Sequence, residues 1–248
     1  MLSDLLLFIA VGFAAQLVDG AIGMAYGLTS TAVLLSLGIP PATASASVHA
    51  AEIFTTGASG LSHWRFGNVD RSLFMRLAIP GAVGGVIGAY LLTELPGDIV
   101  QPVVSAYLAI MGTVVLWRAL RRQVPEPRTP RHVPLLGLSG GFLDAIGGGG
   151  WGPMVASTLV GSGTKARLAI GSTNAAEFVV TASISATFIL TIGLDLWPII
   201  AGLILGGVLA APFAAYVTRS LPDRPLMILV GIVIIVLSLR GLLKAFSF

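Results

Sequence analysis

The chain of 248 residues is strongly apolar: 55% of its residues are hydrophobic, 10% are charged, and its mean hydropathy is +0.93. A soluble domain carries about 25% charged residues, so this composition excludes a cytosolic enzyme or a nucleic-acid-binding module. The 14 Lys and Arg slightly outnumber the 11 Asp and Glu, and the lack of Cys excludes disulfides and thiolate metal sites. We interpret the chain as an all-α polytopic membrane protein.

Six apolar segments are long enough to cross a bilayer once, because about 20 helical residues span the hydrocarbon core. In chain order they lie near residues 43–62, 73–93, 99–118, 168–191, 197–217 and 225–246. An earlier apolar stretch begins after Met1-Leu2-Ser3-Asp4, without a basic region before it or a cleavage site after it. We interpret this stretch as a retained span rather than a signal peptide.

Two other apolar segments, 4–38 and 133–163, are too long for one straight span and are interrupted by glycine. The interrupting residues are Gly20, Gly23 and Gly27 in the first segment, and Gly147 to Gly150, Gly152 and Pro153 in the second. Glycine weakens a helix and allows the chain to reverse. Each segment therefore predicts a hairpin of two short helices that enters and leaves the membrane on one face.

The sequence repeats itself at an offset of 125 residues without a gap. This offset aligns Asp19 with Asp144, and Ala50-Ala51-Glu52 with Ala175-Ala176-Glu177. Apolar composition does not explain why acidic positions deep in apolar sequence recur at one offset, so we predict two homologous halves. The halves cover residues 1–120 and 133–248, and a linker at 121–132 joins them in one membrane transport domain, 1–248.

Basic residues alternate between corresponding loops of the two halves. The loop around Arg71 is basic whereas its counterpart around Asp195 is not, and the loop with Lys165 and Arg167 has a first-half counterpart without Lys or Arg. Cytoplasmic loops are enriched in Lys and Arg, so the alternation predicts two inverted-topology repeats. We expect both termini outside the cytoplasm of a bacterial inner membrane, and the linker 118–132 inside it.

Ionisable residues within spans are costly and usually functional. Glu52 and Glu177 lie near the middle of their predicted spans, and His49 and Asn174 precede them by three residues, on the same helical face. A carboxylate at the bilayer centre needs water, a partner or a proton. We expect His49, Glu52 and Glu177 to couple transport to protons or Na+; the alternative is that each Glu braces the neighbouring hairpin.

Two aspartates, Asp19 and Asp144, stand just ahead of the glycine breaks. An aspartate at this position accepts hydrogen bonds from the free N–H groups of the helix that restarts. Alternatively it contacts the coupling proton or ion directly, so both residues are also candidates for proton coupling.

The glycine breaks are the candidates for substrate binding. Unwound backbone and helix N-termini inside a membrane present N–H donors that suit an oxyanion. The candidates are Gly23, Met24, Ala25 and Tyr26 in the first half, and Gly148, Gly149, Gly150, Trp151 and Asn174 in the second. The alternative interpretation is close helix packing through small residues.

Three stretches carry a family resemblance: Leu17 to Gly27 (LVDGAIGMAYG), Phe142 to Pro153 (FLDAIGGGGWGP) and the small-residue stretch Ala166 to Ala176. In these residues, and over nearly the whole chain, the sequence resembles the TauE/SafE sulfite exporter family. It departs from the family in the first half, where Gly-Met-Ala-Tyr-Gly replaces the usual glycine run. The resemblance implies movement of sulfite, sulfonates or related organosulfur anions across bacterial inner membranes.

We therefore expect a secondary transporter that exports a small sulfur oxyanion, sulfite first, with proton coupling through Glu52 and Glu177. The alternatives are uptake of a sulfonate or other organic anion, and transport of Na+ by the intramembrane acids. An enzyme is not expected, because the three histidines, His49, His63 and His132, do not have ligand spacing. We expect no metal, cofactor or nucleic acid; the partners are the anion, protons or Na+, and the lipid bilayer, with the chain as monomer or homodimer.

Overall fold

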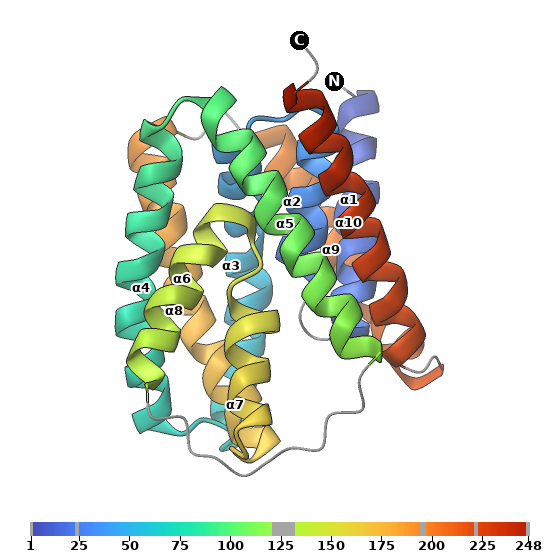
Figure 1. Ribbon diagram of the computed structural model, residues 1–248. Coiled ribbons are helices and arrows are strands. Elements are labelled where there is room, and N and C mark those ends of the chain that lie inside the picture. The colour runs from blue at the N-terminus through green and yellow to red at the C-terminus, as the bar shows by residue number, and fades with distance from the viewer. Residues whose placement is uncertain (1, 23–24, 121–131, 194–196, 221–222, 247–248) are drawn as a thin grey trace.

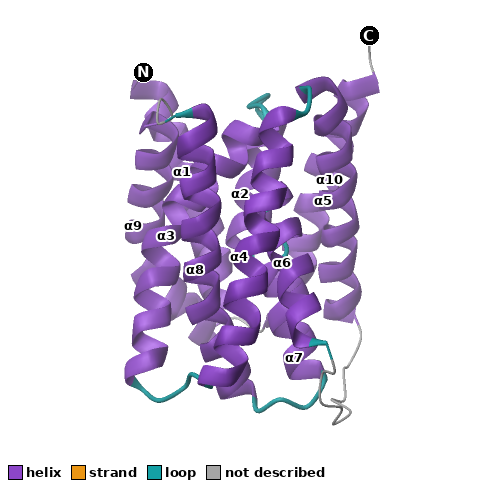
Figure 2. Cartoon of the chain, turned by 90° about the vertical axis from the view of Figure 1, so that its left-hand side faces the viewer, coloured by secondary structure: helices purple, strands orange, loops and turns teal. Residues whose placement is uncertain are grey.

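The computed structural model describes residues 2–22, 25–120, 132–193, 197–220 and 223–246, and every element in these ranges is helical (Figure 1). The helices are α1 (Leu2–Ile22), α2 (Tyr26–Ser36), α3 (Pro41–Arg65), α4 (Arg71–Glu94), α5 (Gly97–Leu120), α6 (Val133–Gly147), the π-helix η1 (Trp151–Ala156), α7 (Ser157–Gly161), α8 (Ala166–Ile192), α9 (Trp197–Ser220) and α10 (Asp223–Phe246). The long helices stand side by side in one bundle (Figure 2). The predicted all-helical class is confirmed.

The six predicted spans correspond to α3, α4, α5, α8, α9 and α10, with both ends of each within three residues of the prediction. By length and composition, the stretches able to cross a membrane within the described part of the chain are Arg71–Glu94, Gly97–Leu120 and Arg167–Ile192. Shorter apolar helical stretches occur at Val133–Gly147, Trp197–Ala210 and Met227–Leu243. These helices support a membrane protein.

The helix α5 ends at Leu120, directly before the linker expected at 121–132, so residues 118–120 of the stretch expected in the cytoplasm (118–132) still belong to the helix. Val115 and Ala119, one turn apart, are both buried, and this contact with the core keeps the last turn helical. Residues 121–131 of the predicted linker lie outside the described ranges.

Both glycine-broken segments are interrupted helices. The first consists of α1 and α2, and the second of α6, η1 and α7. Gly148 ends α6 with a φ of +68°, a left-handed conformation that favours glycine. From one end of the bundle α6 rises to mid-height, where the chain turns and returns to the same end through η1 and α7 (Figure 1).

Glycines bring neighbouring helices into backbone contact. A Cβ atom added to Gly206 in α9 would collide with the backbone of α1 at Ile9, and one added to Gly84 in α4 would collide with the backbone of α6 at Leu138. Small residues allow membrane helices to approach in this way. The long helices α1 and α9 thus pair closely, as do α6 and α4.

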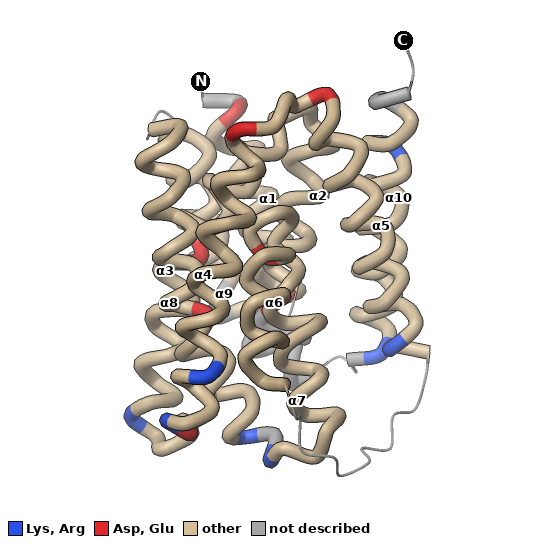
Figure 3. The backbone as a smooth tube through the Cα atoms, turned by 60° about the vertical axis from the view of Figure 1, so that its left-hand side comes forward, with Lys and Arg blue, Asp and Glu red and all other residues tan. Residues whose placement is uncertain are grey.

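The two ends of the bundle differ in charge. Lys and Arg gather at the end where α3 and α5 finish and α4 and α8 begin, whereas α1 begins and α10 finishes at the opposite end (Figure 3). Acidic positions lie at mid-height between these ends (Figure 3). We call the end at which Lys and Arg gather the basic end.

Candidate functional site

Each helical break is held by an aspartate. The N–H groups of Ala25 and Tyr26, at the start of α2, donate to Asp19 Oδ1 over 2.8 and 3.2 Å. The N–H group of Gly150, just before η1, donates to Asp144 Oδ1 over 3.2 Å. Both aspartates therefore cap the helix that restarts after the break, which is the first of their two predicted roles.

The two breaks meet at Gly27 and Gly148. A Cβ atom on Gly27 would lie 2.8 Å from Cα of Gly148, and one on Gly148 would lie 2.7 Å from Cα of Gly27. No side chain fits between them. The start of α2 and the turn after α6 are thus neighbours, although they come from different halves of the chain. Gly23 and Met24, two of the predicted substrate-binding residues, lie outside the described ranges.

His49 of α3 faces the second break. Its Nδ1 atom lies 2.8 Å from the carbonyl oxygen of Ser45, and its Nε2 atom lies 3.5 Å from Asp144 Oδ2. The Ser45 hydroxyl donates to the carbonyl of Ala145 over 2.5 Å. His49 is fully buried and Asp144 is 3% exposed. Two contacts therefore tie α3 to the end of α6, Ser45 to Ala145 and His49 to Asp144, and the second joins two ionisable groups.

The two glutamates approach the same region. Glu52 is buried on α3, one turn from His49, and Glu177 is half-buried on α8. Glu52 lies within Coulombic range of Asp144, Glu177 and Asp19. The structure therefore brings together all four acidic residues that the sequence singled out, and the fold places them between the basic end and its opposite.

Tyr26 and Trp151 are the first residues of α2 and η1, and both side chains are buried. The Tyr26 hydroxyl donates to the carbonyl of Leu203 in α9 over 3.3 Å, and Trp151 Nε1 donates to the carbonyl of Thr173 in α8 over 2.9 Å. The Tyr26 hydroxyl and the Trp151 indole N–H are thus hydrogen-bonded to neighbouring helices. These two side chains therefore anchor the restarting helices α2 and η1 to α9 and α8.

Tyr107 of α5 was not singled out in the sequence, yet it lies against the glycine run. A Cβ atom on Gly147 would be 2.8 Å from its ring, and one on Gly149 would be 3.0 Å from its hydroxyl. This hydroxyl is buried and has no hydrogen-bond partner in the described part of the chain. Tyrosine in membrane proteins usually lies at the interface. A tyrosine near the middle of a predicted span is therefore unusual, and this position could have marked Tyr107 as a candidate site residue.

Several other buried polar atoms near the breaks also lack a hydrogen-bond partner among the described residues. They are His49 Nε2, Asp144 Oδ2 and the hydroxyls of Thr29, Ser30 and Thr31 in α2. Buried polar atoms without a partner are rare in folded proteins. Of these atoms, His49 Nε2 and Asp144 Oδ2 face each other at the second break, and the Tyr107 hydroxyl lies beside Gly149, so these three are suited to bind a polar ligand or water.

Arg118 ties the last turn of α5 to the second hairpin. Its Nη1 atom donates to the carbonyl of Pro153 in η1. A π-helix leaves the regular helical hydrogen-bond pattern and is often found at functional sites. In the sequence Arg118 belongs to the predicted basic linker, and its contact with Pro153 depends on how η1 folds back towards α5.

The chain matches the family described as "Sulfite exporter TauE/SafE" over residues 8–241. The chain belongs to this family. It is 42% identical over 253 residues, covering 98% of the chain and 84% of the relative, to "Probable membrane transporter protein YtnM" of Bacillus subtilis (strain 168). It is 30% identical over 156 residues, covering 59% of the chain and 56% of the relative, to "Probable membrane transporter protein ORF9" of Sinorhizobium sp. No solved structure matches it.

Membership of the TauE/SafE family and the helical fold support a membrane transporter. In this TauE/SafE chain, the described candidates Ala25, Tyr26 and Gly148 to Trp151 gather at the two breaks. Asn174 differs from them, because its Nδ2 atom donates to the carbonyl of Ile170 in its own helix. Among the described residues, no group of three or more His, Asp or Glu could hold a metal ion.

Proposed function

We propose that the chain is a secondary transporter that exports a small sulfur-containing oxyanion, sulfite first, together with protons across a bacterial inner membrane. The description of the family to which the chain belongs supports this substrate. The observation that carries the coupling proposal is the pair of His49 and Asp144, which lies at the break between α6 and η1.

The hydrogen bonds of His49 favour a proton between its ring and Asp144. A carbonyl oxygen only accepts, so Nδ1 carries a hydrogen and donates to Ser45. In a neutral imidazole, Nε2 is then an acceptor, and it faces a carboxylate oxygen, a second acceptor, at 3.5 Å. The arrangement becomes attractive when one proton is bound to either group. This geometry supports His49 and Asp144 as a proton-binding pair.

Anion binding at the breaks follows from helix geometry. The first turn of a helix has N–H groups without acceptors in its own helix. Asp19 takes the N–H of Tyr26 at the start of α2. The next two N–H groups, of Gly27 and Leu28, have no acceptor within the described part of α2, and we infer that they bind the ligand. The partial positive charge of a helix N-terminus stabilises an anion there. We infer that sulfite oxygens bind these N–H groups and the hydroxyl of Tyr107.

The acidic residues near the site require a cation or a proton when an anion is bound. No Lys or Arg precedes Arg65 in the chain, and none occurs between Arg167 and Arg219. The proposed anion site therefore has carboxylates nearby and no basic side chain from α1, α2 or the body of α8. We infer that Glu52 and Glu177 bind protons when sulfite is bound, so that the proton and the anion cross together.

The packing of the helices supports the inverted repeat on which alternating access would depend. The offset of 125 residues relates α1 to α6, α4 to α9, α3 to α8 and α5 to α10. Under this relation the pairing of α1 with α9 is equivalent to that of α6 with α4, and glycine contacts hold both pairs. Transporters with such repeats bind substrate near mid-membrane, between the halves. The basic end would be cytoplasmic.

The test is sulfite efflux from proteoliposomes that contain the full chain, with and without a proton gradient. We expect the gradient to accelerate efflux, and we expect Glu52→Gln and Glu177→Gln to abolish this acceleration. Glu94→Gln is the matched control, because Glu94 is an exposed residue at the end of α4. Efflux that ignores the gradient in the unmodified chain would overturn proton coupling.

Na+ transport is the second candidate, because three other carboxylates lie within Coulombic range of Glu52. It predicts that Na+ raises the thermal stability of the purified chain when no anion is present. Uptake of a sulfonate uses the same anion site, and the direction follows from the gradients that drive it. Flux of a sulfonate such as taurine, with no flux of sulfite, would show that the substrate is a sulfonate and not sulfite, and the proposed anion site would stay the same.

A further inference from the structure

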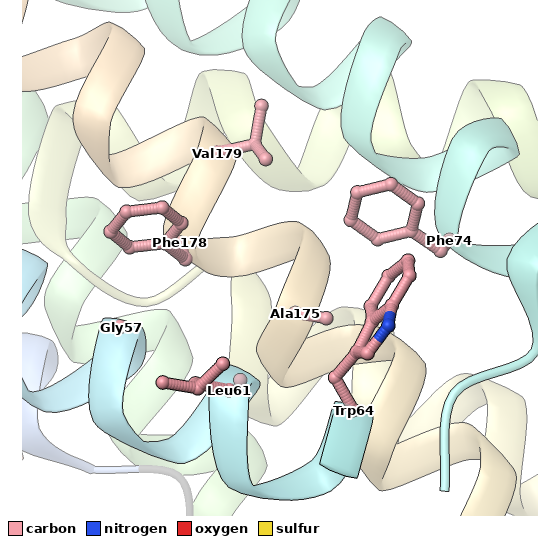
Figure 4. A pocket seen from close by; sticks show the side chains of 8 residues that line it. Gly57, Leu61, Trp64, Phe74, Ala175, Phe178 and Val179 are labelled. Atoms are coloured by element: carbon pink, nitrogen blue, oxygen red, sulfur yellow. The ribbon is translucent and has the colours of Figure 1, made fainter. Parts of the chain in front are cut away.

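An apolar groove lies between α3, α4 and α8, away from the breaks (Figure 4). Its volume is about 350 Å³, near the lower end of the range of roughly 300–1,000 Å³ for small-molecule sites. The lining residues are Gly57, Gly60, Leu61, Trp64, Phe74, Ala175, Phe178 and Val179. None of these side chains is charged, so the groove suits a hydrocarbon ligand.

The groove results from close packing of α3 and α8 at small residues. A Cβ atom on Gly60 would lie 3.1 Å from Cα of Ala175, and one on Gly57 would lie 3.1 Å from the ring of Phe178. The helices therefore touch at glycine, while the larger side chains stand apart beside the contact (Figure 4). Leu61 and Phe178 are 54% and 39% exposed. The groove thus opens on the outer, lipid-facing surface of the bundle.

A cation lies next to one wall of the groove. Trp64 packs edge-on against Phe74, with ring centroids 5.7 Å apart, and the Arg71 guanidinium lies 5.7 Å from the centroid of the Trp64 ring. Arg71 is exposed and begins α4, and the neighbouring Arg65 ends α3. The wall formed by Trp64 therefore adjoins the basic end of the bundle, where aromatic and basic side chains meet the membrane interface.

We propose that this groove binds one anionic phospholipid, with an acyl chain against α3 and α8 and the phosphate at Arg71. The two parts of such a lipid match the two parts of the site: an apolar groove that opens towards the hydrocarbon core, and a guanidinium at its rim. Basic pockets between membrane helices bind anionic lipid headgroups in this way. None of the lining residues belongs to α1, α2, α6 or η1, the helices that flank the breaks, and the proposal does not depend on the substrate.

Lipid binding to the purified full-length chain, measured by native mass spectrometry, tests the proposal. The two probes are dioleoyl phosphatidylglycerol and dioleoyl phosphatidylcholine, which share acyl chains and differ in net charge. We expect one tightly bound phosphatidylglycerol and weaker binding of phosphatidylcholine. Arg71→Gln should weaken phosphatidylglycerol about fivefold, equivalent to about 1 kcal/mol for one basic residue near an anionic headgroup, and leave phosphatidylcholine unchanged.

Leu61→Trp adds volume at an exposed position of the groove, so it should weaken both lipids. The matched controls are Arg240→Gln, on α10 at the end opposite the basic end, and Leu190→Trp, on α8 at a position that is 86% exposed. Both controls should bind the lipids as the unmodified chain does. Equal binding of the two lipids, or a dimer that Leu61→Trp dissociates, would overturn the proposal, the latter because a second copy would then cover the groove.

Discussion

Gly27 and Gly148 touch backbone to backbone at the junction of the two helical breaks, and each would lose this contact if it carried a side chain. One residue belongs to the first turn of α2 and the other ends α6. The contact therefore holds the first turn of α2, whose N–H groups we propose bind the anion, against the turn after α6, beside which Tyr107 lies. Its geometry links the packing of the bundle directly to the proposed substrate site.

Gly27→Ala should destabilise the protein and reduce sulfite flux. The added methyl group would overlap the backbone of Gly148, and extra volume in a packed interior costs about 1–3 kcal/mol. The measurements are the thermal stability of the purified chain and efflux from proteoliposomes. Gly97→Ala is the control, because no atom lies within 4 Å of the added Cβ atom; alanine in a helix is about 0.5–1 kcal/mol more favourable than glycine. Equal stability of the two variants would contradict the contact.

His49→Asn should uncouple transport from the proton gradient. Asparagine stands at the corresponding position of the second half, Asn174, and its amide cannot take up a proton between itself and Asp144. Sulfite should still bind, because the N–H groups at the breaks are unchanged. The measurement is the ratio of efflux with and without a proton gradient, which should fall to about one.

His63→Asn is the control for this change. His63 lies near the end of α3 and contacts Asn68 at 3.3 Å, away from Asp144, so its substitution should leave the gradient dependence intact. A His49→Asn variant that binds sulfite and still responds to the gradient would rule out the pair as the proton site.

The helices and their breaks followed from local properties of the sequence. Hydrophobic segments of spanning length fixed α3, α4, α5, α8, α9 and α10 to within three residues, because a bilayer requires a minimum length of apolar helix. The breaks followed from glycine clusters, and the caps from an aspartate just before each of them. These features depend on neighbours in the sequence.

The features that the sequence did not reveal depend on contacts between distant segments. Tyr107 approaches Gly149 only because α5 packs beside the second hairpin. Arg118 reaches Pro153 only because η1 folds back towards the basic end. A pattern of residue types along one segment carries no information about such partners.

The orientation in the membrane is testable because the chain has no Cys, so that a single introduced cysteine is the sole reactive thiol. Ser62→Cys lies in the last turn of α3 at the basic end, and Asp98→Cys lies in the first turn of α5 at the opposite end; both positions are exposed. With the basic end in the cytoplasm, a membrane-impermeant maleimide should label only Asp98→Cys in intact cells. Labelling of Ser62→Cys before the membrane is opened would reverse the proposed orientation.

Tyr107→Phe should weaken sulfite binding without weakening the fold. The ring packs against Gly147 and is retained, while the buried hydroxyl, which lacks a protein partner in the described residues, is removed. A hydrogen bond to a charged ligand contributes about 1.5–3 kcal/mol, so the Kd for sulfite should rise roughly ten- to hundredfold. Tyr90→Phe is the matched control, because Tyr90 is 50% exposed on α4. Isothermal titration of both variants with sulfite gives the comparison, and an unchanged Kd for Tyr107→Phe would remove this hydroxyl from the anion site.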